Sequence, residues 1–237
     1  MPELSIVVPT FNEVENISLL CSRIQVAVSD QWDYEIVFVD DNSPDGTAEE
    51  VRRVAAGDSR VGLVARAGKL GLASAVVEGF RRCDGRYWVM MDADLSHRPE
   101  DLPSLIAALE RCDVAIGSRY VDGGKVLNWP VWRQIASRFA SWLGGVITGV
   151  KLKDVTSGFA VFRREIVEPR LDMIDPKGFK LVLEIVATTP GVVVKEVPIT
   201  FVDREFGTSK FGIREVFTYL RLCVRLRGLS KPSATPT

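Results

Sequence analysis

Five short apolar runs alternate with amphipathic segments over the first half of the chain. The runs cover residues 4–9, 34–41, 61–66, 87–92 and 113–119. Few polar residues interrupt the runs, whereas apolar residues in the segments between them recur at the spacing of an α-helix. Strands that are apolar throughout and alternate with amphipathic helices are typical of a parallel sheet covered on both faces. We therefore expect an α/β fold with a mostly parallel central sheet and helices on both of its faces.

The alternation becomes less regular after Tyr120. The pattern predicts a loop over 121–130, a long helix over 131–149, and further strands within 154–165 and 192–205. No internal repeat or linker divides the chain, and its 237 residues suit one large domain with at most a small appendage.

Charge and composition exclude several classes of protein. The net charge is −1, which argues against a nucleic-acid partner. The four cysteines include no CxxC pair and suit reduced thiols in a cytoplasmic protein. No window approaches 18 uninterrupted apolar residues, so we expect no membrane span. The apolar run at 4–9 lacks a preceding basic region, so it is expected to be a strand and not a signal peptide.

The apolar run at 87–92 ends in two carboxylates, Asp92 and Asp94, one residue apart. Two like charges this close repel each other, and burial makes the repulsion worse. Mg2+ commonly takes one or two carboxylates and completes its shell with water and phosphate oxygens. If the chain stays extended through Asp94, both side chains point the same way, beyond the carboxyl end of a strand where ligands bind. The pair therefore predicts a divalent-cation site that holds a diphosphate, although a helix cap before Pro99 or a solvated loop would also accommodate it.

Other acidic residues follow neighbouring strands, namely Glu13, Asp40 and Asp41. Common phosphate motifs are missing: no GxGxxG follows the first strand, and residues 68–71 lack the spacing of a P-loop. The lone His97 makes neither a histidine-based metal site nor a catalytic triad, so we interpret it as a loop residue.

Seven segments in this order resemble the dolichol- and polyprenol-phosphate mannosyltransferases of glycosyltransferase family 2. They are SIVVPTFNEVENI (5–17), EIVFVDDNSPDGT (35–47), RAGKLGLASA (66–75), VMMDADLSHRPEDLP (89–103), AIGSRYVDGG (115–124), DVTSGFAVFRR (154–164) and EVPITFVDREFGTSK (196–210). The resemblance covers nearly the whole chain to about Lys210. It implies a Rossmann-like nucleotide-diphospho-sugar transferase fold of the GT-A type. It also implies a catalytic domain over 1–210, followed by a basic amphipathic helix over 211–229 and a flexible tail over 230–237.

The resemblance also implies roles for individual residues. The catalytic residues would be Asp92, Asp94, Arg119 and Arg204. The donor site would be formed by Pro9, Phe11, Glu13, Phe38, Asp40, Asp92, Ala93, Asp94, Arg119, Arg204 and Lys210. Mg2+ or Mn2+ would be held by Asp92 and Asp94, with Ser96 as a weaker or water-mediated contact because many relatives have Gln there. Two further departures are Phe11 for a frequent Tyr and Ala73 for a frequent Gly.

The implied activity is an inverting transfer of mannose from GDP-mannose to a polyprenyl or dolichyl phosphate at a membrane surface. One alternative changes the substrates: a UDP-glucose-dependent lipid-phosphate glucosyltransferase, or a transferase onto a non-lipid glycan. Another alternative is a non-catalytic nucleotide-sugar-binding protein. The sequence does not separate guanine from uracil in the donor, or mannose from glucose.

Many relatives carry transmembrane helices after the catalytic domain, and this chain resembles the form without them. That form implies peripheral binding to the cytoplasmic face of a membrane, with a small membrane-anchoring subunit as a partner. Two segments combine apolar or aromatic residues with basic ones and so suit such binding. The first is residues 129–149, with Trp129, Trp132 and Trp142 beside Arg133 and Arg138. The second is a C-terminal apolar stripe flanked by Arg214, Arg221 and Arg225; the stripe consists of Ile213, Val216, Phe217, Leu220 and Val224. The alternative is that both helices pack on the sheet or on each other. Residues 201–210 are expected to form a mobile lid, or else a solvated turn.

Overall fold

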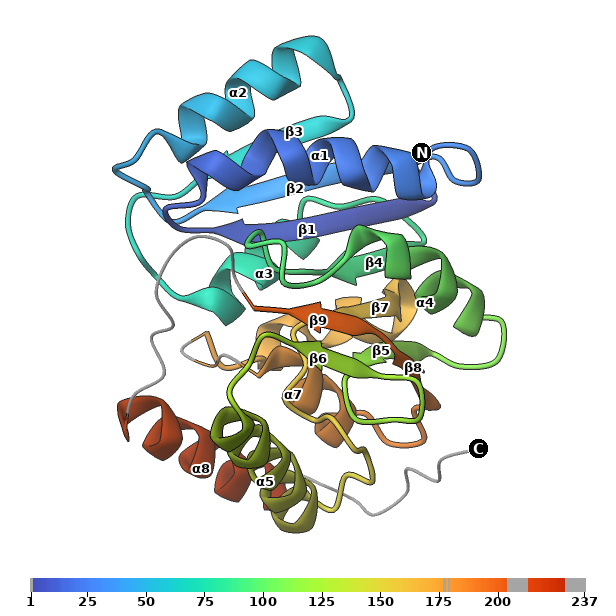
Figure 1. Cartoon of the computed structure of the whole chain (residues 1–237). Coiled ribbons are helices and arrows are strands. Elements are labelled where there is room, and N and C mark those ends of the chain that lie inside the picture. Colours follow the sequence, from blue (N-terminus) through green and yellow to red (C-terminus); the bar gives the residue numbers. More distant parts are fainter. Residues whose placement is uncertain (1, 177, 179, 204–212, 229–237) are drawn as a thin grey trace.

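The computed structural model describes residues 2–176, 178, 180–203 and 213–228, and the side chains of the last helix from Phe217 on. Its centre is a sheet of seven strands in the order β3-β2-β1-β4-β7-β5-β8 (Figure 1). The strands are β1 Leu4–Thr10, β2 Tyr34–Asp40, β3 Val61–Ala65, β4 Tyr87–Met90, β5 Val114–Ser118, β7 Ala160–Arg163 and β8 Val194–Pro198. All neighbouring pairs are parallel except the two that β7 makes with β4 and β5. The prediction of a mostly parallel α/β sheet is confirmed.

Helices cover both faces of this sheet. They are α1 Val14–Val28, α2 Thr47–Gly57, α3 Leu72–Phe80, α4 Leu102–Ala108, α5 Val131–Thr148, α6 Arg164–Val167, α7 Leu181–Thr188 and α8 Ile213–Arg227, with two 3-10 turns at Pro99–Asp101 and Glu168–Met173. Alternate residues of each strand face opposite sides. On β1, Ile6 and Val8 pack with α1 and α4, whereas Val7 packs with α3 and α7. The continuously apolar strands are therefore explained by burial on both faces.

The strand β7 is antiparallel because of where the chain re-enters the sheet. Residues 119–154 lie beyond the carboxyl end of β5, and the backbone N–H of Arg119 donates to the side chain of Asp154 at 3.1 Å. The chain therefore enters β7 from the carboxyl edge and runs back across the sheet. The strand predicted within 154–165 is correspondingly short, because residues 154–159 form turns near that edge.

A second, two-stranded sheet pairs β6 Lys125–Leu127 in parallel with β9 Thr200–Val202. The prediction that 121–130 is entirely loop is thus wrong, since β6 lies within it. The single strand predicted over 192–205 is divided into β8 and β9. This division lets the chain leave the main sheet after Pro198 and pass over the carboxyl edge (Figure 1).

Helices α5 and α8 pack against each other at the same end of the molecule (Figure 1). The buried face of α8 is formed by Tyr219, Leu222, Cys223 and Leu226. This is not the predicted stripe: Phe217 and Val224 are 68% and 66% exposed, and the side chains of Ile213 and Val216 lie outside the described part. None of the described helices is long and apolar enough to cross a membrane.

Candidate functional site

The two carboxylates that follow β4 lie in a buried loop at the carboxyl edge of the sheet. The strand ends at Met90 and the chain bends over residues 93–95, where Leu95 has a φ of 59°. The chain therefore does not stay extended through Asp94, which was the condition for both carboxylates to point the same way. Instead, Oδ1 of Asp94 accepts hydrogen bonds from the backbone N–H and the hydroxyl of Ser96, at 3.1 and 2.5 Å. These bonds fix the buried Asp94, while the side chain of Asp92 stays 34% exposed.

His97 belongs to this site, which the sequence interpretation missed. Its Nδ1 accepts the backbone N–H of Asp92 at 3.4 Å and lies 3.7 Å from the Asp92 carboxylate. The ring stacks on Phe159 and meets the edge of Phe201 at 5.4 Å between ring centres. Burial lowers the pKa of His97, although the charges of Asp92 and Asp94 oppose the change. A histidine in a polar loop carries no sequence signal of this burial.

Arg119 lies beside this loop but is committed to a buried ion pair. Its Nε and Nη2 donate to the two carboxylate oxygens of Asp154 at 2.7 Å each, and Nη2 also donates to the hydroxyl of Thr156 at 2.8 Å. Burial opposes the charged form, but the hydrogen bonds and charge of Asp154 outweigh it and raise the pKa of Arg119. Rings of Tyr120 and Phe201 lie over the guanidinium at 5.0 and 5.3 Å. The charge of Arg119 is thus largely offset by Asp154, and its predicted contact with a phosphate stays a prediction.

A second cation of the site, Lys180, was also missed. It precedes α7, and its Nζ donates to the carbonyl of Thr156 at 2.8 Å. Burial and the nearby charge of Arg119 lower the pKa of Lys180 to about 8, although the charges of Asp154 and Asp92 oppose the change. Lys180 and Asp154 are both far from Asp92 and Asp94 in the sequence, so only the fold brings them to this site.

The carboxyl ends of β1 and β2 form the other half of the site. Pro9, Phe11 and Glu13 are partly accessible there, and their contact with a donor stays a prediction. Glu13 accepts a hydrogen bond from the side chain of Asn16 at 2.7 Å. The Nζ of Lys69 lies 3.7 Å from the centre of the Phe11 ring.

Two predicted donor contacts have other roles in the structure. Phe38 is fully buried in the core, so it packs the sheet and does not line the site. Asp40 is 1% exposed and accepts hydrogen bonds from Thr10 and from both the backbone and the hydroxyl of Ser43. Its carboxylate therefore shapes the turn after β2.

Asp41 anchors the neighbouring loop, a role the sequence did not indicate. It pairs with the buried Arg66 at 2.6 Å and accepts the backbone N–H groups of Leu70 and Gly71 at 3.1 and 3.0 Å. These bonds hold residues 66–71, including Lys69, against the carboxyl ends of β1 and β2.

The donor set suits a hard divalent cation that shares its shell with a substrate. Within the described residues, no group of three His, Cys, Asp or Glu side chains could hold a metal. Asp92 and Asp94 supply oxygen ligands, and the remaining positions would fall to water and phosphate oxygens, as Mg2+ prefers. Gly158 keeps room beside the pair, since a Cβ there would lie 3.3 Å from Oδ2 of Asp92. The predicted basic residues Arg204 and Lys210 lie outside the described residues.

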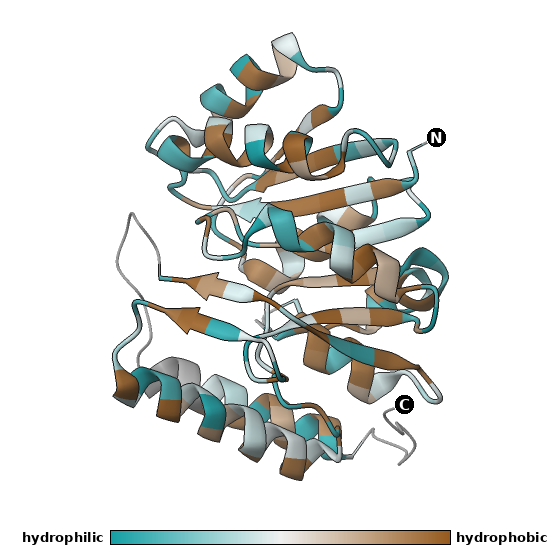
Figure 2. Ribbon diagram, turned by 45° about the vertical axis from the view of Figure 1, so that its right-hand side comes forward, coloured by the Kyte–Doolittle hydropathy of each residue, from teal (hydrophilic) through white to brown (hydrophobic). Residues whose placement is uncertain are grey.

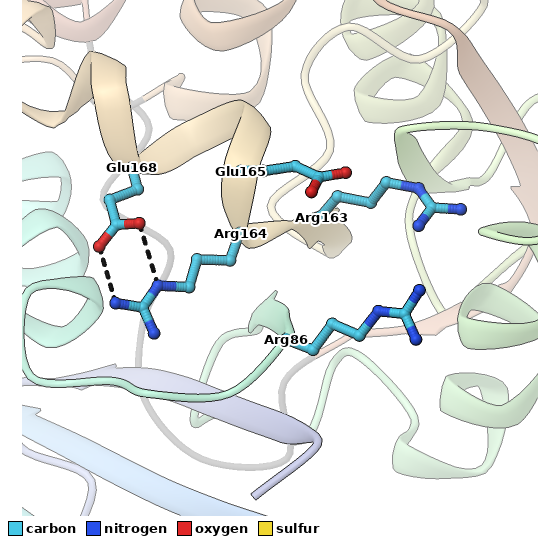
Figure 3. A pocket seen from close by; sticks show the side chains of 5 residues that line it. All are labelled: Arg86, Arg163, Arg164, Glu165 and Glu168. Atoms are coloured by element: carbon cyan, nitrogen blue, oxygen red, sulfur yellow. Dashed lines mark hydrogen bonds and ion pairs between the residues drawn. The ribbon is translucent and has the colours of Figure 1, made fainter. Parts of the chain in front are cut away.

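A pocket of about 190 Å³ lies at the opposite edge of the sheet (Figure 3). It is lined by Arg86, Arg163, Arg164, Glu165 and Glu168. Arg164 and Glu168 pair with each other, and Arg163 donates to carbonyls at the end of α4. Three of the five lining residues are thus engaged in local contacts, and the pocket lies apart from the acidic loop at the carboxyl edge.

Comparison with protein families matches residues 5–171 to glycosyl transferase family 2. A dolichol-phosphate mannosyltransferase from Pyrococcus furiosus is 43% identical over 94% of this chain and 63% of its own length. The chain therefore spans less than two thirds of that relative. An undecaprenyl-phosphate mannosyltransferase from Micrococcus luteus is 40% identical over 87% of this chain and 86% of its own length. A polyprenol monophosphomannose synthase from Mycolicibacterium smegmatis is 40% identical over 87% of this chain and 80% of its own length.

Solved structures share the fold at lower identity. The mannosyltransferase PcManGT from Pyrobaculum calidifontis, in complex with GDP-Man and Mn2+, has a TM-score of 0.66 at 20% identity and covers 94% of this chain and 64% of its own. Glucosyl-3-phosphoglycerate synthase from Mycobacterium tuberculosis, with Mn2+, UDP-glucose and phosphoglyceric acid, has a TM-score of 0.68 at 17% identity over 97% of this chain and 81% of its own. The fold is accordingly of the GT-A type, as the sequence indicated.

Proposed function

Because this chain belongs to glycosyltransferase family 2, we propose that it transfers mannose from GDP-mannose to the phosphate of a polyprenyl lipid. The names of relatives 40 to 43% identical over most of the chain support this choice of sugar and acceptor. The observation that carries the proposal is the juxtaposition of the Asp92 and Asp94 loop with Arg119 and Lys180 at the carboxyl edge of the sheet. Two carboxylates beside two cations suit a metal-bound diphosphate and an anionic acceptor.

In this proposal Asp92 and Asp94 hold Mg2+ or Mn2+. The bound ion would supply charge stabilisation to the departing nucleoside diphosphate. Ser96 orients Asp94 through the 2.5 Å hydrogen bond from its hydroxyl, and its direct contact with the metal stays a prediction. His97 accepts the backbone N–H of Asp92 and so supports the position of the loop that carries this carboxylate.

The acceptor needs no strong general base. The second pKa of a phosphate ester is about 6, so the attacking oxygen is already ionised near neutral pH. We therefore assign Asp92 and Asp94 to the metal and not to proton abstraction. Phe11 and Glu13 are proposed to hold the nucleoside, and Arg204 and Lys210, which lie outside the described residues, to contact the phosphates.

The acceptor side would face a membrane through α5. Its exposed face carries Val131, Trp132, Ile135, Phe139, Trp142 and Val146, each 57 to 70% exposed. These positions fall on one side of a helix with about 3.6 residues per turn. Hydrophobic residues recur along α5 in Figure 2. Aromatic and aliphatic residues on one face of a surface helix suit the membrane interface. The small anchoring subunit stays a prediction of the sequence.

Trp129 has a different role from that predicted. Its ring packs on Phe201, and its Nε1 donates to Asp203, which also pairs with Arg133 at 3.0 Å. It thus belongs to the inner wall of the site and not to the membrane face. The mobile lid predicted for 201–210 falls mostly outside the described residues and stays a prediction.

The proposal is tested by offering radiolabelled GDP-mannose and UDP-glucose, each with polyprenyl phosphate and Mg2+ or Mn2+. We expect label from GDP-mannose in the lipid extract and little from UDP-glucose. If only UDP-glucose labels the lipid, the donor is UDP-glucose and not GDP-mannose. If neither sugar labels the lipid, the proposal of a lipid acceptor is rejected.

A further inference from the structure

Phe201 on β9 contacts three side chains of the site with one ring. The centre of its ring lies 5.4 Å from that of His97 and 5.1 Å from that of Trp129, and both pairs meet edge to face. The guanidinium carbon of Arg119 lies 5.3 Å from the same ring centre. Edge-to-face aromatic pairs and a cation near an aromatic ring are both attractive. The ring of Phe201 therefore joins parts of the site that are far apart in the sequence.

The backbone of β9 is bonded to the loop that carries the two carboxylates. The N–H of Val202 donates to the carbonyl of Ser96 at 3.1 Å. The N–H and the hydroxyl of Ser96 donate in turn to Asp94, at 3.1 and 2.5 Å. On the other flank of the aromatic residue, the N–H of Thr200 donates to the carboxylate of Asp101 at 3.2 Å. These bonds give β9 a fixed position relative to the loop.

The contact between Phe201 and His97 bears on the second carboxylate. Nδ1 of His97 accepts the backbone N–H of Asp92 at 3.4 Å, and its ring also stacks on the buried Phe159. The imidazole is 3% exposed, so its position depends on the rings that pack around it. Without the ring of Phe201, the imidazole would have room to move away from the backbone of Asp92.

We propose that Phe201 is a positioning residue for the metal-binding loop. Its ring holds the imidazole of His97 against the backbone of Asp92 and limits the movement of the Arg119 guanidinium. This inference rests on the proposed function, in which the loop binds a metal and, through it, a diphosphate. Loss of the ring would then weaken metal-dependent binding of a nucleoside diphosphate and leave metal-independent binding unchanged.

The alternative is that Phe201 only packs the small β6–β9 sheet onto the rest of the protein. Under this alternative, loss of the ring would lower the melting temperature without changing the affinity for nucleotide and metal. The two roles are separated by measuring GDP affinity in Mn2+ and in EDTA, because the effect of a packing defect alone would not depend on the metal.

The test compares Phe201→Leu, which keeps an apolar side chain but removes the ring, with Phe201→Tyr, which keeps the ring. The matched control is Leu127→Ala on β6. Leu127 is 44% exposed and follows the strand partner of Phe201, so its side chain points to the other face of the same small sheet.

We expect Phe201→Leu to weaken GDP binding in Mn2+ by about 10-fold, the scale of one aromatic pair together with one cation–π contact. Its GDP affinity in EDTA, measured by calorimetry like the first, should equal that of the wild type. The Phe201→Tyr and Leu127→Ala proteins should bind GDP as the wild type does in both conditions. In the transfer assay, kcat/KM for GDP-mannose should fall in Phe201→Leu alone.

The inference is overturned if Phe201→Leu binds GDP in Mn2+ as tightly as the wild type, if its affinity falls equally in EDTA, or if Phe201→Tyr shows the same loss. If Phe201→Leu does not fold, Phe201→Met replaces it and the same outcomes apply. If the wild-type enzyme transfers no sugar to lipid, the proposed function fails, whereas the inference is still decided by the same comparison with GDP and with UDP. Equal wild-type affinities in Mn2+ and in EDTA for both nucleotides would reject it.

Discussion

At the scale of single residues, Asp94 is the position on which the metal-dependent chemistry depends most. It is 5% exposed and fixed by two hydrogen bonds from Ser96, so its carboxylate has a defined direction. We expect Asp94→Asn to lower kcat by about 100-fold or more, as for other groups that stabilise developing charge. Asp30→Asn, an exposed change at the opposite edge of the sheet, is the control. Full activity of the Asp94 variant, or of the wild type in EDTA, would contradict the assignment.

The Arg119–Asp154 pair makes a prediction about stability. The two side chains are 7% and 0% exposed, so removal of one partner leaves the other charged group buried and uncompensated. Burial raises the pKa of Asp154, but the hydrogen bonds of Arg119 outweigh it and hold that pKa below its ordinary value. Asp154→Asn should lower the free energy of unfolding by about 3 to 5 kcal/mol, measured by urea denaturation.

The matched control is Asp172→Asn, whose partner Arg81 is also largely exposed. A solvent-exposed ion pair contributes little to stability. The urea midpoint of the Asp172→Asn variant should therefore stay near that of the wild type. Equal midpoints for the Asp154 and Asp172 variants would show that the buried pair does not stabilise the fold.

The sequence could predict these residues only in part. Asp92 and Asp94 were candidates because they follow an apolar strand, but the other resembling segments were needed to prefer a metal-binding role over a helix cap or a solvated loop. Asp154 and Lys180 lie 60 and more positions further along the chain and reach the site through the antiparallel entry of β7 and the start of α7. His97 and Phe38 were misjudged because burial of a single side chain depends on neighbours that come from other elements.

At the scale of the elements, α5 is the surface expected to contact lipid. We predict that Trp132→Ser combined with Trp142→Ser abolishes most co-sedimentation with anionic liposomes, because the two rings are 67% and 60% exposed on one face. Leu19→Ser with Val26→Ser, also exposed but on α1, should leave binding unchanged. Equal loss in both double variants, or no binding by the wild type, would contradict a specific role for α5.

The role of α8 differs from the prediction in an instructive way. Arg225 is engaged within the protein, since it pairs with the buried Glu184 on α7 and lies 3.7 Å from Asp175. A change of Arg225 to Glu would therefore disrupt the contact between α8 and α7. The exposed Arg221 is the better position for testing attraction to anionic lipid. Helical spacing indicated an amphipathic helix, but it did not tell which of its two apolar stripes is buried.

At the scale of the whole molecule, the strand and helix alternation was enough to predict the layered α/β architecture. Continuous apolar runs need burial on both faces, and this requirement fixes the layers. The direction of β7 and the separate β6–β9 pair could not be predicted, because they depend on where the chain turns beyond the carboxyl edge. That edge also gathers the carboxylate loop, the cations and α5, so donor, acceptor and membrane would meet on one side.

The central claim is tested most directly by mass spectrometry of the lipid extract after incubation of the enzyme with GDP-mannose, polyprenyl phosphate and Mn2+. The account predicts a polyprenyl phosphate that has gained one hexose, formed by the wild type and Asp30→Asn but lost in EDTA and in Asp94→Asn. Unmodified lipid in all reactions, or the same product in EDTA, would contradict it.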